Sequence, residues 1–371
     1  MGKYYPPEVG GIESHLQILS EHLSKWTDVQ VLVALAGRDA GSIGSVPKVS
    51  RAWSLLNVAG APICPSMVPR IAFARADIVH VHLPNPGAVL ACLASGFRGC
   101  LVATWHSDVV RQKKLMRLFG PFLRLFLSSC SAIIVATKEY LESSDQLAEW
   151  ADRCQVVPYG ISVADFDTVD QTAVERIKRW AGSPIVLAAG RLVYYKGIDY
   201  LLRAMREVDA TLVIAGDGPD YPKLEQLAWE MGIRSRIVFA GKVDDLRPYY
   251  HAADVFVLPS IARSESFGIV QLEAMACRTP VVNTRIPTGV PSVSIDGITG
   301  FTVPPADSEA LASALRRMLT ETDRRLAFGQ AARKRVEEIY SAGAMANRVT
   351  EIYADLLSRR TGLPEVSPRA V

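Results

Sequence analysis

The sequence lacks the features that mark a membrane-spanning or secreted protein. No apolar run in its 371 residues reaches the ~18–20 residues that cross a bilayer, so an integral membrane helix is excluded. No signal peptide is expected, because residues 3–7 lead into Gly10-Gly11 instead of an apolar stretch. The six cysteines show no CxxC spacing and are expected to be reduced core residues. These absences favour a cytoplasmic protein.

A strong net charge is also missing. The 41 basic residues nearly balance the 38 acidic ones, which leaves a formal net charge of +3. This balance argues against nucleic acid as a partner. The hydrophobic content of 49% excludes disorder for most of the length. At ~100–200 residues per domain, the length predicts two domains that each bury a core.

Short apolar runs alternate with amphipathic stretches along the chain. Two series of strands are predicted, at residues 29–35, 77–83, 101–106, 132–137 and 155–158, and at 185–189, 211–215, 236–240, 254–259 and 280–283. Because these runs are continuously apolar, both faces of each sheet should be covered, as in doubly wound parallel sheets. We predict an α/β fold with domains at 1–162 and 163–357, the last helix being a candidate to return to the first domain, and a tail at 358–371.

The beginning of the chain departs from this pattern. A doubly wound domain normally starts with a strand that feeds its first glycine-rich loop, yet only residues 1–5 precede Pro6-Pro7. The first strand is therefore expected to be missing or shortened. We expect either that the natural start lies upstream of Met1 or that the protein is unstable.

Two predicted strand-to-helix turns are suited to binding a diphosphate. Gly10-Gly11 precedes a helix, and glycines there let backbone N–H groups approach a phosphate, although a plain tight turn accounts for them equally well. Arg191 and Lys196 follow the strand at 185–189. Two cations at that position can bind one diphosphate, or they can be solvated surface cations of a turn.

Two further turns offer groups for sugar hydroxyls. Glu265 and Glu273 flank Gly268 after the strand at 254–259, with Glu265 just before a helix and Glu273 about two turns inside it. The alternatives are a helix-dipole acid for Glu265 and a solvated helix face for Glu273. His106 ends another strand and can contact a sugar hydroxyl or be a structural residue. His80 and His82 have no third ligand at metal-site spacing and are interpreted as packing groups.

These segments resemble the retaining glycosyltransferases of family 4, from about residue 4 to residue 357. The most specific marks are Glu265 and Glu273 with Phe267-Gly268 between them, followed by residues 189–192 leading to Lys196-Gly197. Supporting marks are Gly10-Gly11 with Glu13 and residues 157–161, 215–219, 238–241, 254–260 and 296–300. The resemblance implies the GT-B fold, in which two Rossmann-like domains face each other across a central cleft.

The resemblance also implies a role for each matched residue. Gly11 would approach the donor diphosphate, which Arg191 and Lys196 would neutralise as it leaves. The transferred sugar would be bound by Glu265, by the backbone at Phe267, Gly268 and Ile269, and by His106 from the other domain. Glu273 would bind the ribose, and the backbone around Lys242 and Val243 would contact the base. The catalytic set would be His106, Glu265, Arg191 and Lys196, with Glu265 as a positioning residue.

The implied reaction needs a nucleotide sugar and no further cofactor. The Asp-x-Asp motif at Asp165–Asp167 falls in the predicted linker, away from the diphosphate loop, so no metal is expected. Residues 288–291 and 106–113 resemble bacterial mannosyl- and rhamnosyltransferases that build lipopolysaccharide O-chains. This subgroup favours GDP-mannose or a GDP-deoxyhexose as donor and a glycan or polyprenyl-diphosphate-linked acceptor.

A basic amphipathic stretch covers residues 109–129. It combines five cations with Leu and Phe residues, which is typical of a helix lying on an anionic membrane surface. Packing of its apolar side on the first domain explains the Leu and Phe residues equally well. A peripheral location on the inner face of the plasma membrane is therefore one expectation.

The same scaffold also supports other functions. A dehydrogenase would show G-x-G-x-x-G after its first strand, and the nearest match at residues 216–219 lacks the third glycine. A UDP-sugar-dependent transferase, an epimerase or phosphorylase of the same fold, and a non-catalytic partner of a transferase complex stay open as alternatives.

Overall fold

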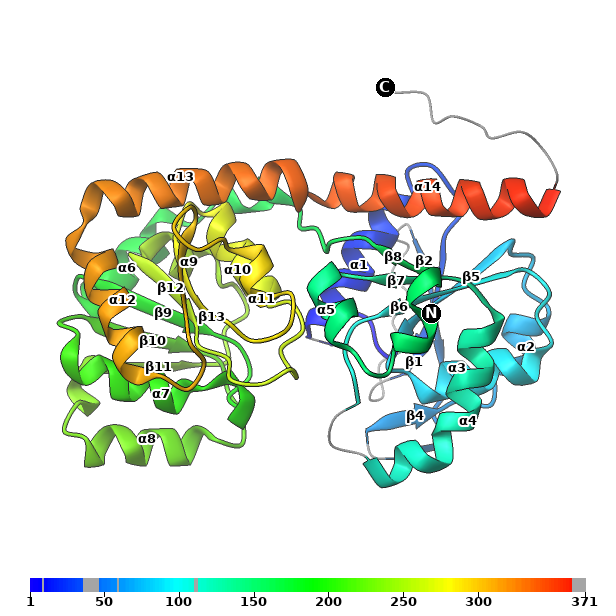
Figure 1. The fold of residues 1–371 in the computed structure, drawn as a ribbon, viewed down its shortest axis with the longest axis horizontal. Helices are drawn as coiled ribbons and strands as arrows, with labels where there is room; N and C mark the ends of the chain where they lie inside the picture. Colours follow the sequence, from blue (N-terminus) through cyan, green and yellow to red (C-terminus); the bar gives the residue numbers. More distant parts are fainter. Residues whose placement is uncertain (9, 36–46, 59, 110–112, 362–371) are drawn as a thin grey trace. The chain divides into compact units, whose positions relative to one another are not determined.

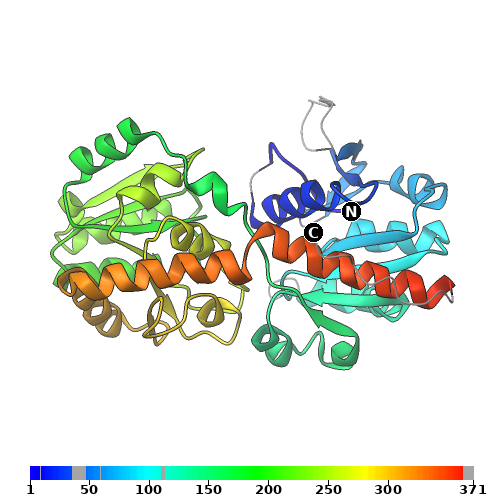
Figure 2. The same ribbon diagram turned by 90° about the horizontal axis from the view of Figure 1, so that it is seen from above.

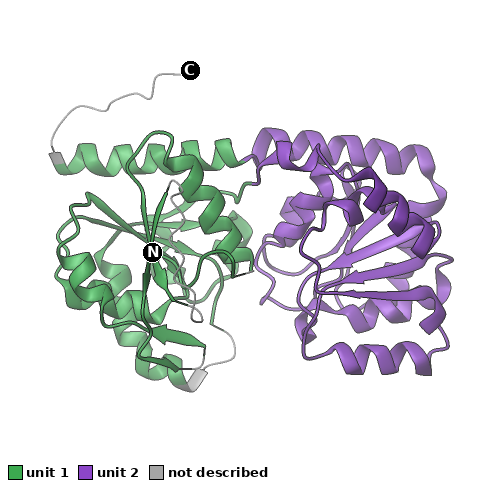
Figure 3. Cartoon of the chain, turned by 180° about the vertical axis from the view of Figure 1, so that it is seen from behind, with its two compact units in different colours: residues 1–160, 342–371 green, residues 161–341 purple. Residues whose placement is uncertain are grey.

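A computed structural model describes residues 1–8, 10–35, 47–58, 60–109 and 113–361, without the side chains of Lys113, Lys114 and Thr361 (Figure 1). The chain divides into two compact units (Figure 3). Unit 1 comprises Met1–Gly160 and Ala342–Val371, and unit 2 comprises Ile161–Ser341. The division falls two residues before the expected boundary, and the last helix belongs to unit 1.

Unit 1 is built on parallel strands with helices on both faces. Its strands are β1 (Gln30–Ala34), β2 (Lys48–Ala52), β3 (Leu56–Val58), β4 (Ala61–Ile63), β5 (Ile78–Leu83), β6 (Cys100–Trp105), β7 (Cys130–Val135) and β8 (Cys154–Val156). Its helices are α1 (Gly11–Leu23), α2 (Met67–Ala72), α3 (Pro86–Ser95), α4 (Lys113–Ser129), α5 (Lys138–Ser143) and α14 (Ala342–Thr361). The order β5-β6-β7-β8 forms one sheet, β1 and β2 form a parallel pair, and β3 and β4 form an antiparallel pair.

The first residues join two of these sheets. The His82 N–H donates to the Met1 carbonyl at 2.9 Å, and the Gly2 N–H donates to the Leu32 carbonyl at 3.2 Å. Residues 1–3 therefore lie between β1 and β5, where the first strand of a doubly wound domain runs, although they form no regular strand.

The core of unit 1 has two layers because strand side chains alternate between the faces of the sheet. Leu101, Ala103 and Trp105 of β6 pack with α2, α3 and α4, whereas Cys100 and Val102 pack with α1 and α14. Both faces are covered, which explains why the strand reads as one apolar run. Figure 1 shows α1 next to α14, and these helices are in direct contact.

Unit 2 contains one fully parallel sheet of six strands between helices (Figure 2). The strands are β9 (Ile185–Ala189), β10 (Thr211–Ala215), β11 (Ile237–Gly241), β12 (Val255–Leu258), β13 (Val281–Thr284) and β14 (Gly300–Val303). The helices are α6 (Gln171–Ala181), α7 (Ile198–Ala204), α8 (Tyr221–Glu230), α9 (Arg247–Ala252), α10 (Ile269–Ala276), α11 (Val290–Val293), α12 (Ser308–Thr320) and α13 (Thr322–Ile339).

The strand order of unit 2 is β11-β10-β9-β12-β13-β14. The chain thus winds outward from β9 in one direction, then returns to place β12 on the other side of β9. Ligands in such sheets bind outside the carboxyl ends of the strands at this reversal point.

The sequence missed β2, β3, β4 and β14. Strands β3 and β4 have three residues each, and every side chain of β3 is exposed, so neither leaves an apolar run. Strand β14 begins at Gly300, where a Cβ atom would lie 1.8 Å from the Val281 carbonyl oxygen. The pairing with β13 therefore requires glycine at this position. All six cysteines are free, as predicted.

Candidate active site

The reversal point of the unit 2 sheet brings two loops together. Strand β9 ends at Ala189 and continues into Gly190-Arg191, while its neighbour β12 ends at Leu258 and continues toward Glu265. The Ile261 N–H donates to the Tyr195 carbonyl at 2.8 Å and fixes one loop to the other. The predicted cations and the predicted carboxylate thus lie on adjoining loops.

Gly197 permits this close approach. Its φ of +65° lies in the left-handed region, and a Cβ there would meet the Pro259 carbonyl oxygen at 2.2 Å. Gly216 permits a second close approach, between the loops that follow β10 and β9. Its φ is +150°, and a Cβ there would lie 1.9 Å from the Gly190 carbonyl oxygen. The glycines of residues 216–218 therefore hold the β9 loop in place.

Lys196 and Glu265 form an ion pair at this point. The Nζ of Lys196 lies 2.6 Å from Oε2 of Glu265, and the side chains are only 12% and 11% exposed. Ser260 Oγ donates to the same carboxylate oxygen at 3.1 Å. In a buried pair of this kind, removal of one member leaves the charge of the other buried without compensation.

Arg191 differs from Lys196 because its side chain is exposed. Within the described ranges no hydrogen bond or ion pair engages its guanidinium group. Burial and the Glu265 carboxylate raise the pKa of Tyr195, whereas Lys196 and Arg191 oppose that rise. Both cations therefore influence the same tyrosine hydroxyl. Arg191 is thus a cation available to an anionic ligand.

Glu265 precedes a helix, as predicted, but that helix begins so late that Glu273 lies about one turn inside it and not two. Glu265 and Phe267 belong to the loop, and α10 starts at Ile269 with Gly268 as its N-cap in the left-handed region, at a φ of +74°. The ring of Phe267 is fully buried and packs edge-on against Tyr340 at 5.9 Å between centroids. The packing of the Phe267 ring therefore holds the backbone of this turn in position.

Glu273 is not on a solvated face. Tyr250 of α9 is fully buried, and its hydroxyl donates to Glu273 Oε2 at 2.7 Å. Burial raises the pKa of Glu273, and the hydrogen bond from Tyr250 opposes the rise. Lys242, which is exposed, and Val243 directly follow β11, at the same edge of the sheet.

The remaining predicted residues, Gly11 and His106, belong to unit 1. Gly11 is exposed and is the first residue of α1. His106 follows β6 and is only 3% exposed. Its Nε2 lies 3.0 Å from His82 Nδ1, and its Nδ1 lies 2.6 Å from the Tyr159 hydroxyl. Both ring nitrogens thus contact protein groups.

His80 and His82 are packing and hydrogen-bonding groups, as predicted: His80 contacts Tyr353 and Thr104, and His82 contacts His106. Strands β5 and β6 pair so that His82 lies beside Thr104, two residues before His106, and α1 adds His15. The ligand atoms of His15, His82 and His106 all lie within 4.8 Å of one another. His15 falls on the apolar face of α1 with Leu19, so its burial could be predicted but not its neighbours.

Other sequence features have structural roles. Asp167 forms an ion pair with Arg333 at 2.8 Å, and Arg333 lowers the pKa of Asp167. No described helix combines the length and the apolar character needed to cross a bilayer.

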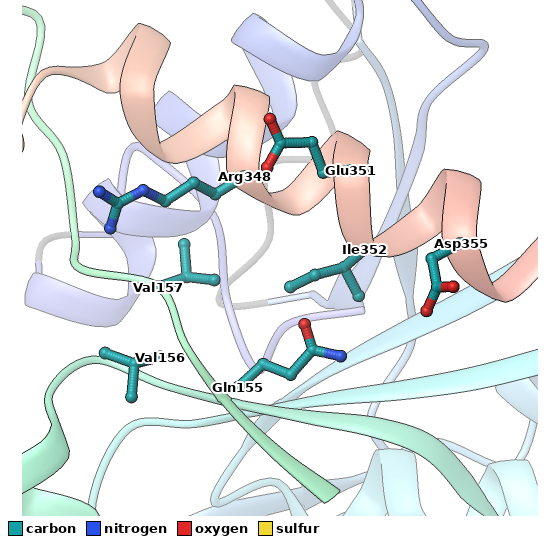
Figure 4. Close-up of a pocket in the computed structure, with 7 residues that line it drawn as sticks. All are labelled: Gln155, Val156, Val157, Arg348, Glu351, Ile352 and Asp355. Atoms are coloured by element: carbon teal, nitrogen blue, oxygen red, sulfur yellow. The ribbon is translucent and has the colours of Figure 1, made fainter. Parts of the chain in front are cut away.

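A polar hollow of about 440 Å³ lies in unit 1 between β8 and α14, and Figure 4 shows Gln155 and Val157 opposite Arg348 and Ile352. None of the predicted site residues lines this hollow.

Two family descriptions match the chain. Residues 9–165 match "Glycosyltransferase Family 4" and residues 170–335 match "Glycosyl transferases group 1". D-rhamnosyltransferase WbpZ of Pseudomonas aeruginosa is 31% identical over 348 residues, which cover 91% of this chain and 90% of that protein. This chain belongs to the family 4 glycosyltransferases. O-antigen chain mannosyltransferase C of Escherichia coli is 29% identical over 367 residues, 96% of this chain and 98% of its own length.

Solved structures share the fold of this glycosyltransferase. Sucrose-phosphate synthase from Thermosynechococcus elongatus superposes with a TM-score of 0.79 at 24% identity, covering 95% of this chain and 94% of that one. Anabaena HepE in complex with UDP gives a TM-score of 0.77 at 19% identity, covering 95% and 98%. The predicted GT-B fold and transferase activity are thereby confirmed, and the dehydrogenase interpretation is excluded.

Proposed function

We propose that this glycosyltransferase transfers a hexose, mannose or a deoxyhexose such as rhamnose, from a GDP-linked donor with retention of configuration. The acceptor is a glycan or a lipid-linked glycan of cell-surface polysaccharide synthesis. The relatives named as an O-antigen mannosyltransferase and a D-rhamnosyltransferase support this choice. The observation that carries the proposal is the Lys196–Glu265 pair beside Arg191 at the reversal point of the sheet.

The pair explains how donor binding and catalysis are coupled. In the structure, Glu265 neutralises Lys196. A diphosphate brings more negative charge to Arg191 and Lys196, and both cations stabilise the charge that develops as the sugar leaves. Glu265 is then released to accept hydrogen bonds from sugar hydroxyls and to stabilise an oxocarbenium-like ring.

Two cations at the diphosphate offset the leaving-group charge without a metal ion there. We therefore propose that the transfer step needs no divalent cation at the diphosphate and no cofactor beyond the nucleotide sugar. Glu273 with Tyr250 is assigned to the ribose, and the backbone around Lys242 and Val243 to the base. Phe267, Gly268 and Ile269 present the turn that contacts the sugar, and Gly11 is assigned to the donor diphosphate.

A thermal-shift screen tests the donor. GDP and GDP-mannose are expected to raise the unfolding midpoint more than UDP, UDP-glucose or NAD. A ligand present at about a hundredfold excess over its Kd stabilises the folded state by ~2.7 kcal/mol, which such a screen resolves. A shift with UDP-sugars alone would keep the transferase and reject the GDP assignment. NAD serves as the matched non-donor dinucleotide.

We also propose that α4 contacts the membrane that holds the acceptor. Leu123 and Phe126 of this helix are buried in the unit 1 core, as the packing interpretation requires. A second apolar row, Leu118, Phe122 and Leu125, is 76%, 48% and 56% exposed. Of the five cations predicted there, Arg117 and Arg124 are described and exposed, whereas Arg111 and the side chains of Lys113 and Lys114 lie outside the described residues.

Liposome co-sedimentation tests this contact. The wild-type protein is expected to bind anionic vesicles at low salt, and Leu118→Glu with Phe122→Glu is expected to abolish that binding, because burial of apolar surface and attraction to anionic lipid are both lost. Leu326→Glu is the matched control, since Leu326 is 59% exposed in unit 2. Equal sedimentation of the α4 variant and the control would contradict the proposal.

A further inference from the structure

Two buried amide side chains of unit 2 meet next to the turn that follows Glu265. Gln271 is the third residue of α10 and Asn283 is the third residue of β13, and both are fully buried. Asn283 Nδ2 donates to Gln271 Oε1 at 2.9 Å. Burial of a polar side chain costs free energy unless its polar atoms are paired, so the neighbours of both amides decide whether the pair is tolerated.

Gln271 holds the backbone of this turn. Its Nε2 donates to the Phe267 carbonyl at 3.1 Å and to the Val290 carbonyl at 3.4 Å. The Phe267 carbonyl immediately precedes Gly268, whose φ of +74° in the left-handed region shapes the turn. A Cβ at Gly268 would lie only 2.9 Å from Gln271 Nε2, so the amide packs directly against the turn.

Asn283 fixes the orientation of Gln271. Its Nδ2 also donates to the carbonyls of Val290 and Ser294, at 3.0 and 3.3 Å, and its Oδ1 accepts from Thr302 Oγ1 at 2.7 Å. Carbonyl oxygens surround the nitrogens of both amides, and a carbonyl oxygen can only accept a hydrogen bond. Neither amide can therefore flip without losing these bonds, and the pair has one arrangement.

A backbone contact ties the same turn to the loop after β13. The Gly289 N–H donates to the Ser266 carbonyl at 2.8 Å. The carbonyls of two successive residues, Ser266 and Phe267, are thus held by protein donors. The loop that supplies Gly289 is itself fixed by the buried side chains of Thr288 and Val290. The position of the turn is therefore set by β13 and its loop as well as by the local sequence.

We propose that Gln271 and Asn283 are positioning residues for the transfer reaction, which hold the turn at Phe267-Gly268 in the conformation that contacts the transferred sugar. This inference rests on the proposed assignment of that turn to the sugar. Neither amide contacts the donor itself, since both are fully buried. A displacement of ~1 Å at a reacting centre can cost ~100-fold in rate, so a buried support of the turn affects catalysis without touching substrate.

Gln271→Met tests the inference, because methionine has a similar length but cannot donate to the Phe267 carbonyl. One measurement is kcat of sugar transfer to a membrane extract. The other is the ratio of the Kd of GDP to that of GDP-mannose, with UDP and UDP-glucose measured in parallel. We expect kcat to fall ~10–100-fold and the ratio to fall as well. The Kd of the nucleoside diphosphate should not change, because its phosphates are assigned to Arg191 and Lys196 on the other loop.

Thr211→Val is the matched control. It removes the hydrogen bond from Thr211 Oγ1 to the Ala181 carbonyl, at 2.6 Å. Thr211 begins β10 and so lies at the amino edge of the sheet, opposite to the candidate site. This variant is expected to have a lower unfolding midpoint with wild-type kcat and a wild-type Kd ratio.

Asn283→Ser guards against misfolding of Gln271→Met. It keeps the donor to the Phe267 carbonyl but removes the group that orients it, so kcat should fall in the same direction by a smaller factor. Wild-type kcat and Kd ratio in a folded Gln271→Met, or in Asn283→Ser if the first variant does not fold, would overturn the inference alone. A wild-type protein that binds none of the four ligands would reject the proposed donor class, and the inference with it.

Discussion

Replacement of Arg191 by alanine is expected to reduce transfer about 30- to 1000-fold, which corresponds to ~2–4 kcal/mol of lost transition-state stabilisation. The fold should not change, because the Arg191 side chain is exposed. The measurement is the rate of sugar incorporation into a membrane extract, with the donor that the thermal-shift screen selects. Lys178→Ala is a matched control for the loss of an exposed cation of unit 2 outside the candidate site.

Lys196→Ala is expected to cause a similar loss of transfer and also to lower stability. Its removal leaves the Glu265 carboxylate buried without its cation, which costs ~3–5 kcal/mol in comparable pairs. The double variant Lys196→Ala with Glu265→Gln separates the two effects, because a neutral amide needs no cation. It should recover much of the unfolding midpoint but none of the activity. Normal transfer in both Arg191→Ala and Lys196→Ala would refute the diphosphate assignment.

Unit 1 is expected to lose stability steeply when the pH falls below about 6.5. Burial lowers the pKa of His15 to about 3 and holds those of His80, His82 and His106 well below 6.5. In the unfolded chain these imidazoles titrate near ~6.5. The unfolded chain therefore binds more protons below that pH, so stability is complete above it and is lost as the pH falls.

The expected slope is large. Each imidazole that is neutral when folded and charged when unfolded contributes ~1.4 kcal/mol per pH unit. His15, His80, His82 and His106 all contribute in this direction. Since whole domains are stable by only ~5–15 kcal/mol, unfolding is expected within about two pH units.

Urea unfolding between pH ~8 and ~5 measures this slope. His82→Gln should reduce it by about one proton. A midpoint that does not move between those pH values would contradict the burial of neutral imidazoles.

The fold class and the loops that carry the candidate site could be predicted from local sequence patterns. Continuous apolar runs such as residues 185–189 are possible only where both faces of a sheet are covered, so they predict parallel strands between helices. Glycines at positive φ, such as Gly197 and Gly268, mark the turns after these strands. These signals are local, which is why Arg191, Lys196 and Glu265 could be placed at strand ends without coordinates.

Which of these groups contact one another depends on how the strands and helices pack. Lys196 reaches Glu265 because β12 returns to pair with β9, and no local pattern encodes that strand order. Tyr250 meets Glu273, and His15 meets His82 and His106, through packing between elements far apart in the chain. Periodicity shows that a side chain is buried but not what covers it, because partners are chosen by the packing of whole elements.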